Sequence, residues 1–262
     1  MNGEFMRTHF LVAVVLFLGI VQGNITKSTT PNEIKVQKTN ITTEQVLKDS
    51  LFAVLYPNVF EAITNYYGVR KQFMNEIITE VSHIDENNEK YHFLVRVKLD
   101  TFEHAHNPPY GKDFITFEID LGKVTVTDFK HKGDKWESKI SAFKNRVIQD
   151  IQKTFGIDFT LYKEFEYGQL LYASEKQKEL QSLVEINKQI IEQDLQPKVT
   201  GGYKNVLNPF TFIKDNYGYI VYKKSNGTNV VITVKREDGT WTVIRKSNKN
   251  GVPMKSELLW YM

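Results

Sequence analysis

The sequence predicts an α+β protein of two small modules, each with a helix followed by a curved antiparallel sheet. Apolar residues recur every three or four positions near residues 43–67 and 136–156, which is typical of helices with one buried face. Shorter stretches of alternating apolar and polar residues follow each of these segments, separated by turn residues as in hairpins. Packing the helix on the apolar face of the sheet is the simplest way to bury the apolar residues of both.

The composition is that of an ordinary globular protein. The 262 residues include 41% hydrophobic and 25% charged side chains, and the formal net charge is +3. So small a positive excess gives no reason to expect nucleic acid as a partner. Cysteine is absent, so the fold is held by its core without disulfides. In a secreted chain of this size, the absence of cysteine is more typical of bacteria than of eukaryotes.

The N-terminus has the features of a secretory signal peptide. Arg7 precedes an uninterrupted apolar run at 10–21, and Gly23 offers a small residue for a signal peptidase. The run of 12 residues is shorter than the roughly 20 that span a bilayer, so we expect no stable membrane span after processing. We therefore predict a signal peptide over 1–23 and a flexible polar leader over 24–42. An uncleaved N-terminal anchor is the alternative.

The first module is predicted over 43–132. Thr42 and Thr43 carry hydroxyls that suit a helix N-cap, and Gly68 is suited to end that helix. Pro57 lies between them and is expected to interrupt the helix or to begin a second one. The strands predicted after the helix form a meander at 77–84, 91–102, 114–121 and 124–130.

The second module is predicted over 138–262, with its boundary to the first between about 132 and 138. Residues 136–156 and 175–193 have helical periodicity, whereas 158–172 alternate and are predicted to be extended. The predicted strands of this module are 210–213, 218–224, 228–235 and 240–245.

Two dipeptides in the second module, Asn226-Gly227 and Asp238-Gly239, are typical of hairpin turns of the primed type. They place the last three predicted strands next to one another. The order of a helix and then a curled sheet is similar to that of cystatin-like and nuclear-transport-factor-like folds. The analogy concerns architecture and carries no function.

Several short motifs in the first module occur together in a known family. They are Leu55-Tyr-Pro57, Ala62-Ile63, Tyr66-Tyr67-Gly68, Phe102, His106-Asn-Pro108, Gly111, Ile115-Thr-Phe117, Val126 and Phe129-Lys-His131. Through them, residues 45–132 resemble a domain-of-unknown-function family found in secreted proteins of spore-forming Gram-positive bacteria. The resemblance implies secretion and a compact α+β module, without catalytic residues to transfer. His104 and Pro109 depart from the family's pattern.

The segment 101–111 is the densest in special residues and is the first place to expect a site. His104 and His106 are two apart at a strand end, so their side chains share one face. His131 ends the last strand of the meander and comes near them if the strands pair as hairpins. Three imidazoles suit zinc or copper, and we expect no other cofactor.

The alternative for this segment is a rigid structural turn without metal. It would consist of His106, Asn107, Pro108, Pro109 and Gly111. Because neither proline donates a hydrogen bond, the histidine and asparagine side chains would satisfy the backbone groups left unpaired in the turn.

Tyrosines are dense in the second module and form a candidate ligand surface. Exposed tyrosines on a sheet are common in carbohydrate- and protein-binding surfaces, and cross-strand packing is the alternative. The residues proposed for this surface are Tyr110, Tyr203, Tyr217, Tyr219 and Tyr222.

No pattern of nucleophilic catalysis is present, because cysteine is absent and no serine lies in a Gly-x-Ser-x-Gly motif. The leading hypothesis is a secreted, non-catalytic protein of the extracellular space or cell envelope that binds a protein, a wall polymer or a glycan. One alternative is a metal-dependent hydrolase that uses His104, His106 and His131. Another is a structural or sporulation-associated envelope component.

Overall fold

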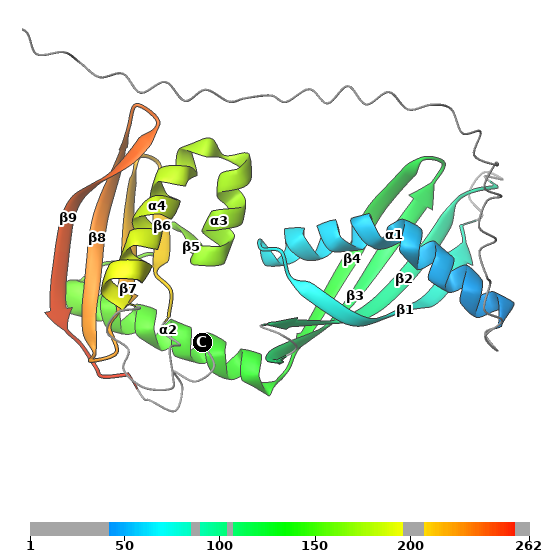
Figure 1. The fold of residues 1–262 in the computed structure, drawn as a ribbon, viewed down its shortest axis with the longest axis horizontal. Helices are drawn as coiled ribbons and strands as arrows, with labels where there is room; N and C mark the ends of the chain where they lie inside the picture. Colours follow the sequence, from blue (N-terminus) through cyan, green and yellow to red (C-terminus); the bar gives the residue numbers. More distant parts are fainter. Residues whose placement is uncertain (1–41, 85–89, 104–106, 196–206, 255–262) are drawn as a thin grey trace, which may run out of the picture. The chain divides into compact units, whose positions relative to one another are not determined.

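The computed structural model forms helices and two antiparallel sheets, of four and five strands (Figure 1). The predicted α+β class is therefore confirmed. All the described residues belong to one compact unit, Thr42–Met262. The predicted signal peptide and nearly all of the predicted leader lie outside the described residues, as does Tyr203. The described ranges are 42–84, 90–103, 107–195 and 207–254.

Helix α1 (Thr43–Tyr67) begins and ends as predicted but is not interrupted at Pro57. The Thr42 hydroxyl accepts from the Gln45 amide at 3.2 Å, and Gly68 ends the helix in the left-handed conformation. Pro57 lacks only the hydrogen bond that its amide would donate to the exposed Ala53. Buried residues before and after the proline hold both halves of the helix on the sheet, so the expected interruption is wrong.

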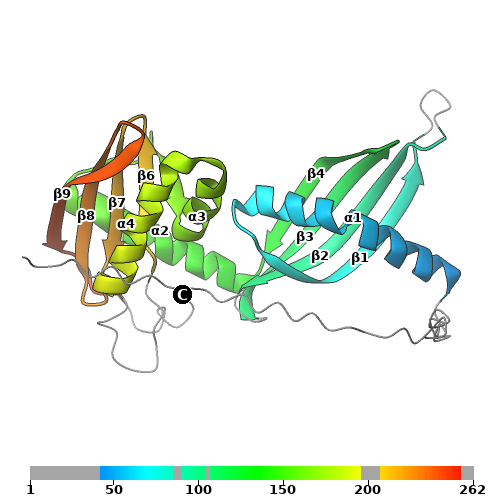
Figure 2. The same ribbon diagram turned by 45° about the horizontal axis from the view of Figure 1, so that its top comes forward.

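The first sheet has the order β1-β2-β3-β4, so the predicted four-strand meander is confirmed. Its strands are β1 (Gln72–His83), β2 (Phe93–Glu103), β3 (Asn107–Asp120) and β4 (Lys123–Gly133). Helix α1 lies across one face of this sheet (Figure 2). The core between them is apolar and includes Leu55, Val59 and Ile63 from α1 and Val95, Val97, Leu99, Ile115 and Phe117 from the sheet.

Strand β3 begins earlier than predicted. Asn107–Gly111 was expected to form a turn, but it is extended and belongs to β3. Phe102 of β2 pairs with Tyr110, and Gly111 pairs with both Thr101 of β2 and Gly133 of β4. Pairing with a strand on each side outweighs the local preference of an Asn-Pro-Pro sequence for a turn. The Pro108–Pro109 peptide bond is cis.

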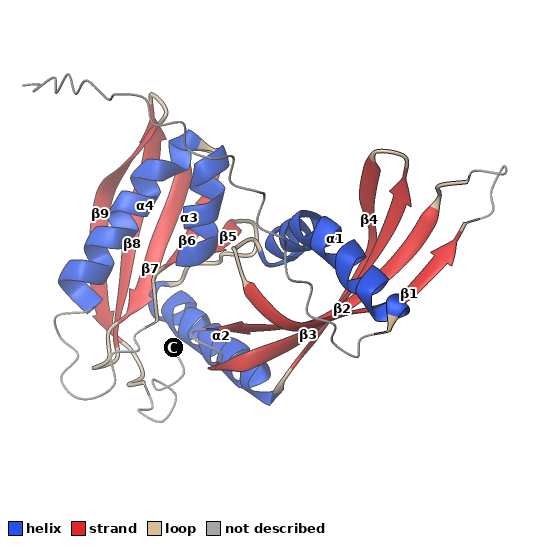
Figure 3. Cartoon of the chain, turned by 45° about the vertical axis from the view of Figure 1, so that its right-hand side comes forward, coloured by secondary structure: helices blue, strands red, loops and turns tan. Residues whose placement is uncertain are grey.

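The second sheet is covered on both faces and has the order β5-β6-β7-β8-β9. Helix α2 (Lys135–Phe155) packs on one face through Val147 and Ile151, while α3 (Tyr167–Lys176) and α4 (Gln181–Ile190) pack on the other (Figure 3). The strands are β5 (Lys163–Glu166), β6 (Phe210–Lys214), β7 (Tyr217–Lys223), β8 (Thr228–Glu237) and β9 (Thr240–Asn250).

Two predictions for the second module were wrong in part. Of the stretch 158–172, only β5 is a strand, and α3 begins directly after it at Tyr167. The single helix predicted over 175–193 is divided, because α3 ends at Lys176 and a short 3₁₀ turn precedes α4. The division lets α3 and α4 lie side by side on the same face of the sheet, where both bury their apolar residues.

The two predicted hairpin turns differ from each other. Asp238 and Gly239 both have positive φ, as a type I′ turn requires, so this prediction is confirmed. In the turn between β7 and β8, Gly227 has positive φ (92°) and Asn226 does not. The Gly227 amide donates to the Lys224 carbonyl and the Lys224 amide to the Thr228 carbonyl, so this loop is one residue longer than a primed two-residue turn.

Candidate functional site

A polar network lies at the end of the first sheet where α1, β2, β3, β4 and α2 meet. We call the set Tyr67, Thr101, Asp113, His131 and Glu137 the Tyr67–His131 network. The Asp113 carboxylate, fully buried, accepts from the Tyr67 hydroxyl at 2.9 Å and from the Thr101 hydroxyl at 2.8 Å. His131 places Nδ1 2.7 Å from Asp113 and Nε2 2.9 Å from Glu137. Five elements are thus joined through one buried carboxylate.

Two glycines leave the space that this network needs. A Cβ atom at Gly111 would lie 2.5 Å from the Thr101 hydroxyl, 2.6 Å from His131 Cε1 and 2.9 Å from the Tyr67 hydroxyl. A Cβ atom at its cross-strand partner Gly133 would lie 1.7 Å from the Glu137 carboxylate. Since real Cβ atoms do not approach other atoms so closely, a side chain at either position would displace these groups from the positions they take in the network.

The neighbourhood keeps the Tyr67 phenol protonated. Burial raises the pKa of Tyr67 far above its ordinary value, the Thr101 hydrogen bond lowers it in part, and the charge of Asp113 raises it further. Burial and the same carboxylate also raise the pKa of Tyr66. The Tyr67 hydroxyl is therefore a hydrogen-bond donor at neutral pH, and a role as a proton acceptor does not fit its surroundings.

Both ring nitrogens of His131 already have carboxylate partners. Nδ1 lies at hydrogen-bond distance from Asp113 and Nε2 from Glu137, so a carboxylate faces each ring nitrogen. A metal ion at His131 would have to displace one of these contacts. His104 and His106 lie outside the described residues, so the predicted three-histidine centre stays a prediction. Within the described ranges, no group of three or more His, Cys, Asp or Glu side chains is arranged to hold a metal.

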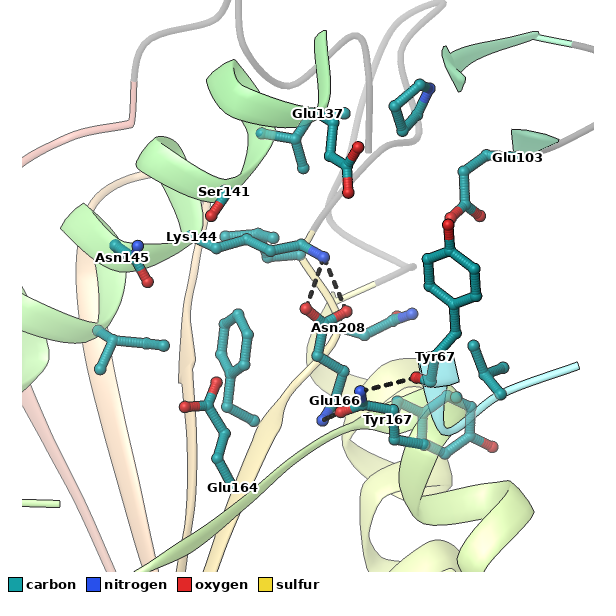
Figure 4. Close-up of a pocket in the computed structure, with 18 of the residues that line it drawn as sticks. Tyr67, Glu103, Glu137, Ser141, Lys144, Asn145, Glu164, Glu166, Tyr167 and Asn208 are labelled. Atoms are coloured by element: carbon teal, nitrogen blue, oxygen red, sulfur yellow. Dashed lines mark hydrogen bonds and ion pairs between the residues drawn. The ribbon is translucent and has the colours of Figure 1, made fainter. Parts of the chain in front are cut away.

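Beside the network, a cleft of about 510 Å³ opens (Figure 4). Tyr67 and Glu137 belong both to the network and to the cleft wall. Residues of α2, β5, α3 and β6 form much of the rest. The lining mixes charged groups with aliphatic and aromatic side chains, among them Ile148 and Phe210. A cleft of this size and mixed character is suited to a small polar ligand or to one side chain of a larger one.

The far wall of the cleft holds two carboxylates on one face of β5. Both oxygens of Glu166 accept from Lys144 Nζ at 2.7 Å, and the Glu166 side chain also caps α3 in a capping box with Gln169 (Figure 4). Gln169 donates to the Tyr67 carbonyl at 3.1 Å, which joins α3 to the end of α1. Glu164 is exposed, yet desolvation by neighbouring atoms and then the charge of Glu166 raise its pKa, while the charge of Lys144 lowers it in part.

The tyrosines proposed for a ligand surface differ in exposure. Tyr222 is 1% exposed and its hydroxyl donates to Asp194, so its place in a ligand surface is wrong. Tyr217 and Tyr219 lie on the opposite face of β7, because side chains alternate along a strand. Tyr217 is half exposed, while Tyr219 packs against Phe159. Tyr110 is partly buried.

Sequence reasoning found His131 and Gly111 but missed the residues that complete the network. Thr101, Asp113 and Glu137 look like ordinary polar positions of strands and of a helix. One signal pointed to part of the network: Tyr67, Gly111 and His131 all lie in the motifs on which the family resemblance rests. No short sequence motif indicated the cleft, because its lining residues come from segments far apart in the chain.

Fold and site together define an α+β protein whose first sheet, with α1, is closed by a buried polar network. Residues 47–132, which are about a third of the chain, match the family described as a protein of unknown function, DUF3888. The matched region runs from the first turn of α1 almost to the end of β4. The resemblance of the first module to a family of unknown function is thus confirmed. No curated protein matches the chain. In the part of the chain that the structure describes, no helix is both long and apolar enough to cross a membrane.

Proposed function

We propose that this chain is a secreted, non-catalytic binding protein of the extracellular space or cell envelope, and that its ligand occupies the cleft beside the Tyr67–His131 network. The sequence features that support secretion are the apolar run at 10–21 and the small residue Gly23. If the signal peptide is removed as proposed, N-terminal sequencing of secreted material begins at Asn24. Material that begins at Met1 or Met6 would contradict secretion by this route.

The observation that carries the binding role is the cleft itself. It is lined by both charged and apolar side chains, which is the character of sites that bind small ligands. The nearby network holds its wall in place, because Glu137 is fixed by His131 and Tyr67 by Asp113. The proposed partner is a protein, a wall polymer or a glycan, each of which presents polar groups on a flexible chain.

A blocking variant tests whether the cleft is the binding site. Ser141 of α2 lines the cleft, so Ser141→Trp fills it, whereas Ser138→Trp makes the same change on the same helix outside it. Purified peptidoglycan fragments, wall teichoic acid and chitin oligosaccharides are titrated by calorimetry. We expect one of them to bind the wild type and Ser138→Trp but not Ser141→Trp. Equal binding by Ser141→Trp would place the site elsewhere.

The two alternatives to the proposed binding protein are tested by different measurements. A metal-dependent hydrolase with His104, His106 and His131 would bind zinc or copper stoichiometrically, and alanine at any of the three would abolish that binding. A structural or sporulation-associated envelope component differs from the proposed binding protein in its partner alone. Fractionation of producing cells, followed by cross-linking, identifies that partner.

A further inference from the structure

The charged side chains of the cleft are paired with one exception. Lys71 lies 3.0 Å from Glu103, Lys144 lies 2.7 Å from Glu166, and Glu137 accepts from His131. Among the described residues that line the cleft, Glu164 is the one charged side chain without a hydrogen bond or ion pair. The cleft therefore contains one carboxylate whose charge the protein does not neutralise directly.

The backbone fixes the position of this carboxylate. Glu164 and Glu166 are two apart on β5, so both side chains point from the same face, while Phe165 between them is 5% exposed and packs in the core. Pairing of β5 with β6 sets Glu164 opposite Phe212. The Lys144 ammonium lies at hydrogen-bond distance from both oxygens of Glu166, and it acts on Glu164 through its charge without a hydrogen bond.

The electrostatic environment favours a cation at this point. Two effects raise the pKa of the exposed Glu164, namely desolvation by neighbouring protein atoms and the charge of Glu166, and the charge of Lys144 lowers it in part. A ligand cation beside Glu164 would offset both. A hydrogen bond from an ammonium group to a carboxylate is charge-assisted and is roughly twice as strong as one between neutral groups.

We propose that the cleft binds a ligand through a primary ammonium group that pairs with Glu164, while the aliphatic part of the ligand contacts Ile148 and Phe210. The ligand class is thus an alkyl amine, either free or as the side chain of a lysine-like residue in a peptide. This inference rests on the proposed binding role of the cleft and adds the chemistry of what it binds.

The test uses the full mature chain and four probes of similar size in ¹H–¹⁵N NMR titrations. Two probes carry the ammonium: 1,5-diaminopentane, and a Gly-Lys-Gly tripeptide blocked at both ends. The same tripeptide with an acetylated lysine is neutral, and glutarate is anionic. We expect an ammonium probe to shift resonances of cleft residues and the neutral and anionic probes to shift none. Which of the two ammonium probes binds more tightly distinguishes a free amine from a peptide source.

The variant Glu164→Gln should weaken binding of the ammonium probe about tenfold, the usual effect of losing one charge-assisted hydrogen bond. Glu185→Gln on α4 is the matched control, since Glu185 is exposed and does not line the cleft. Unchanged affinity in Glu164→Gln, or equal loss in both variants, would overturn the inference. Binding of the neutral or anionic probe at the cleft would overturn it while leaving the proposed binding role intact. Binding of the blocked cleft variant Ser141→Trp to wall material would instead overturn the binding role of the cleft.

Discussion

The two sheets bury their charged groups in different ways. In the first sheet, Asp113 is fully buried and has partners from three other elements, and His131 extends the network to Glu137 of α2. In the second, two aspartates form separate clusters: Asp150 of α2 accepts from Lys223, Asn229 and the Val252 amide, and Asp194 accepts from Tyr222 and Lys246. The first sheet has a helix on one face and the second has helices on both. In this protein the singly covered sheet gathers its buried polar contacts into one network at its end, whereas the doubly covered sheet divides them between two clusters.

The largest effect is expected in the second sheet, from Asp150→Ala. The Lys223 side chain is 3% exposed, and its ammonium lies 2.6 Å from Asp150. Removing the carboxylate leaves a buried charge without its counter-ion, which costs about 3–5 kcal/mol in the free energy of unfolding. Urea unfolding measures this loss. The double variant Asp150→Ala/Lys223→Met should recover most of it, because no buried charge then remains, and a double variant as unstable as the single one would contradict this account.

In the first sheet, Gly111→Ala should be nearly as damaging. Its Cβ would overlap Thr101, His131 and Tyr67, so the network must open and leave Asp113 without some of its donors. We expect a loss of about 3 kcal/mol. Gly168→Ala in helix α3 is the control, since a Cβ atom at Gly168 would contact only the Val69 side chain, at 3.3 Å. That variant should stay within about 1 kcal/mol of the wild type. Similar losses in the two variants would mean that the network does not depend on the space at Gly111.

Acid should affect the second sheet through Asp194. Burial raises the pKa of Asp194, but hydrogen bonds from Lys246 and Tyr222 outweigh it and lower the pKa to about 2 from the ordinary 3.8. The folded state therefore gains stability above pH 3.8 and loses it as pH falls towards 2. Asp194→Asn should cost about 2 kcal/mol at pH 7 and almost nothing near pH 2. Chemical unfolding at both pH values checks this, and a difference that does not depend on pH would refute it.

High pH should destabilise the first sheet through Tyr67. At neutral pH, substitution of Tyr67 is expected to have the smallest effect of the four predictions. Tyr67→Phe removes one hydrogen bond to Asp113 and should cost about 1 kcal/mol at pH 7. Because the folded pKa of Tyr67 is raised, the phenol opposes folding once pH rises above 10, so the wild type loses stability there. Tyr67→Phe should lose less stability than the wild type above pH 10, and chemical unfolding at pH 7 and above pH 10 measures the difference. Tyr91→Phe, at a half-exposed position, is the control and should follow the wild type.

Part of the candidate site could be predicted and part could not. His131, Tyr67 and Gly111 are visible in the sequence because they lie in short motifs beside a helix end and a strand end. Asp113 and Thr101 look like any polar residue in an alternating strand. Their meeting depends on the register of β2 with β3 and of β3 with β4, where Thr101 pairs with Gly111 and Asp113 with His131. Local spacing does not encode that register.

The sequence by itself determined the α+β class, the four-strand meander and the start of α2, because these follow from apolar periodicity and turn residues within one segment. Tertiary structure decided whether α1 continues through Pro57, whether Asn107–Gly111 pairs as a strand, and where α3 begins. Tertiary structure also determines which residues line the cleft and that Glu164 is left there without a hydrogen-bond partner. In each case a local preference of about 1–3 kcal/mol competes with burial against distant residues. Only the assembled core shows which of the two is larger.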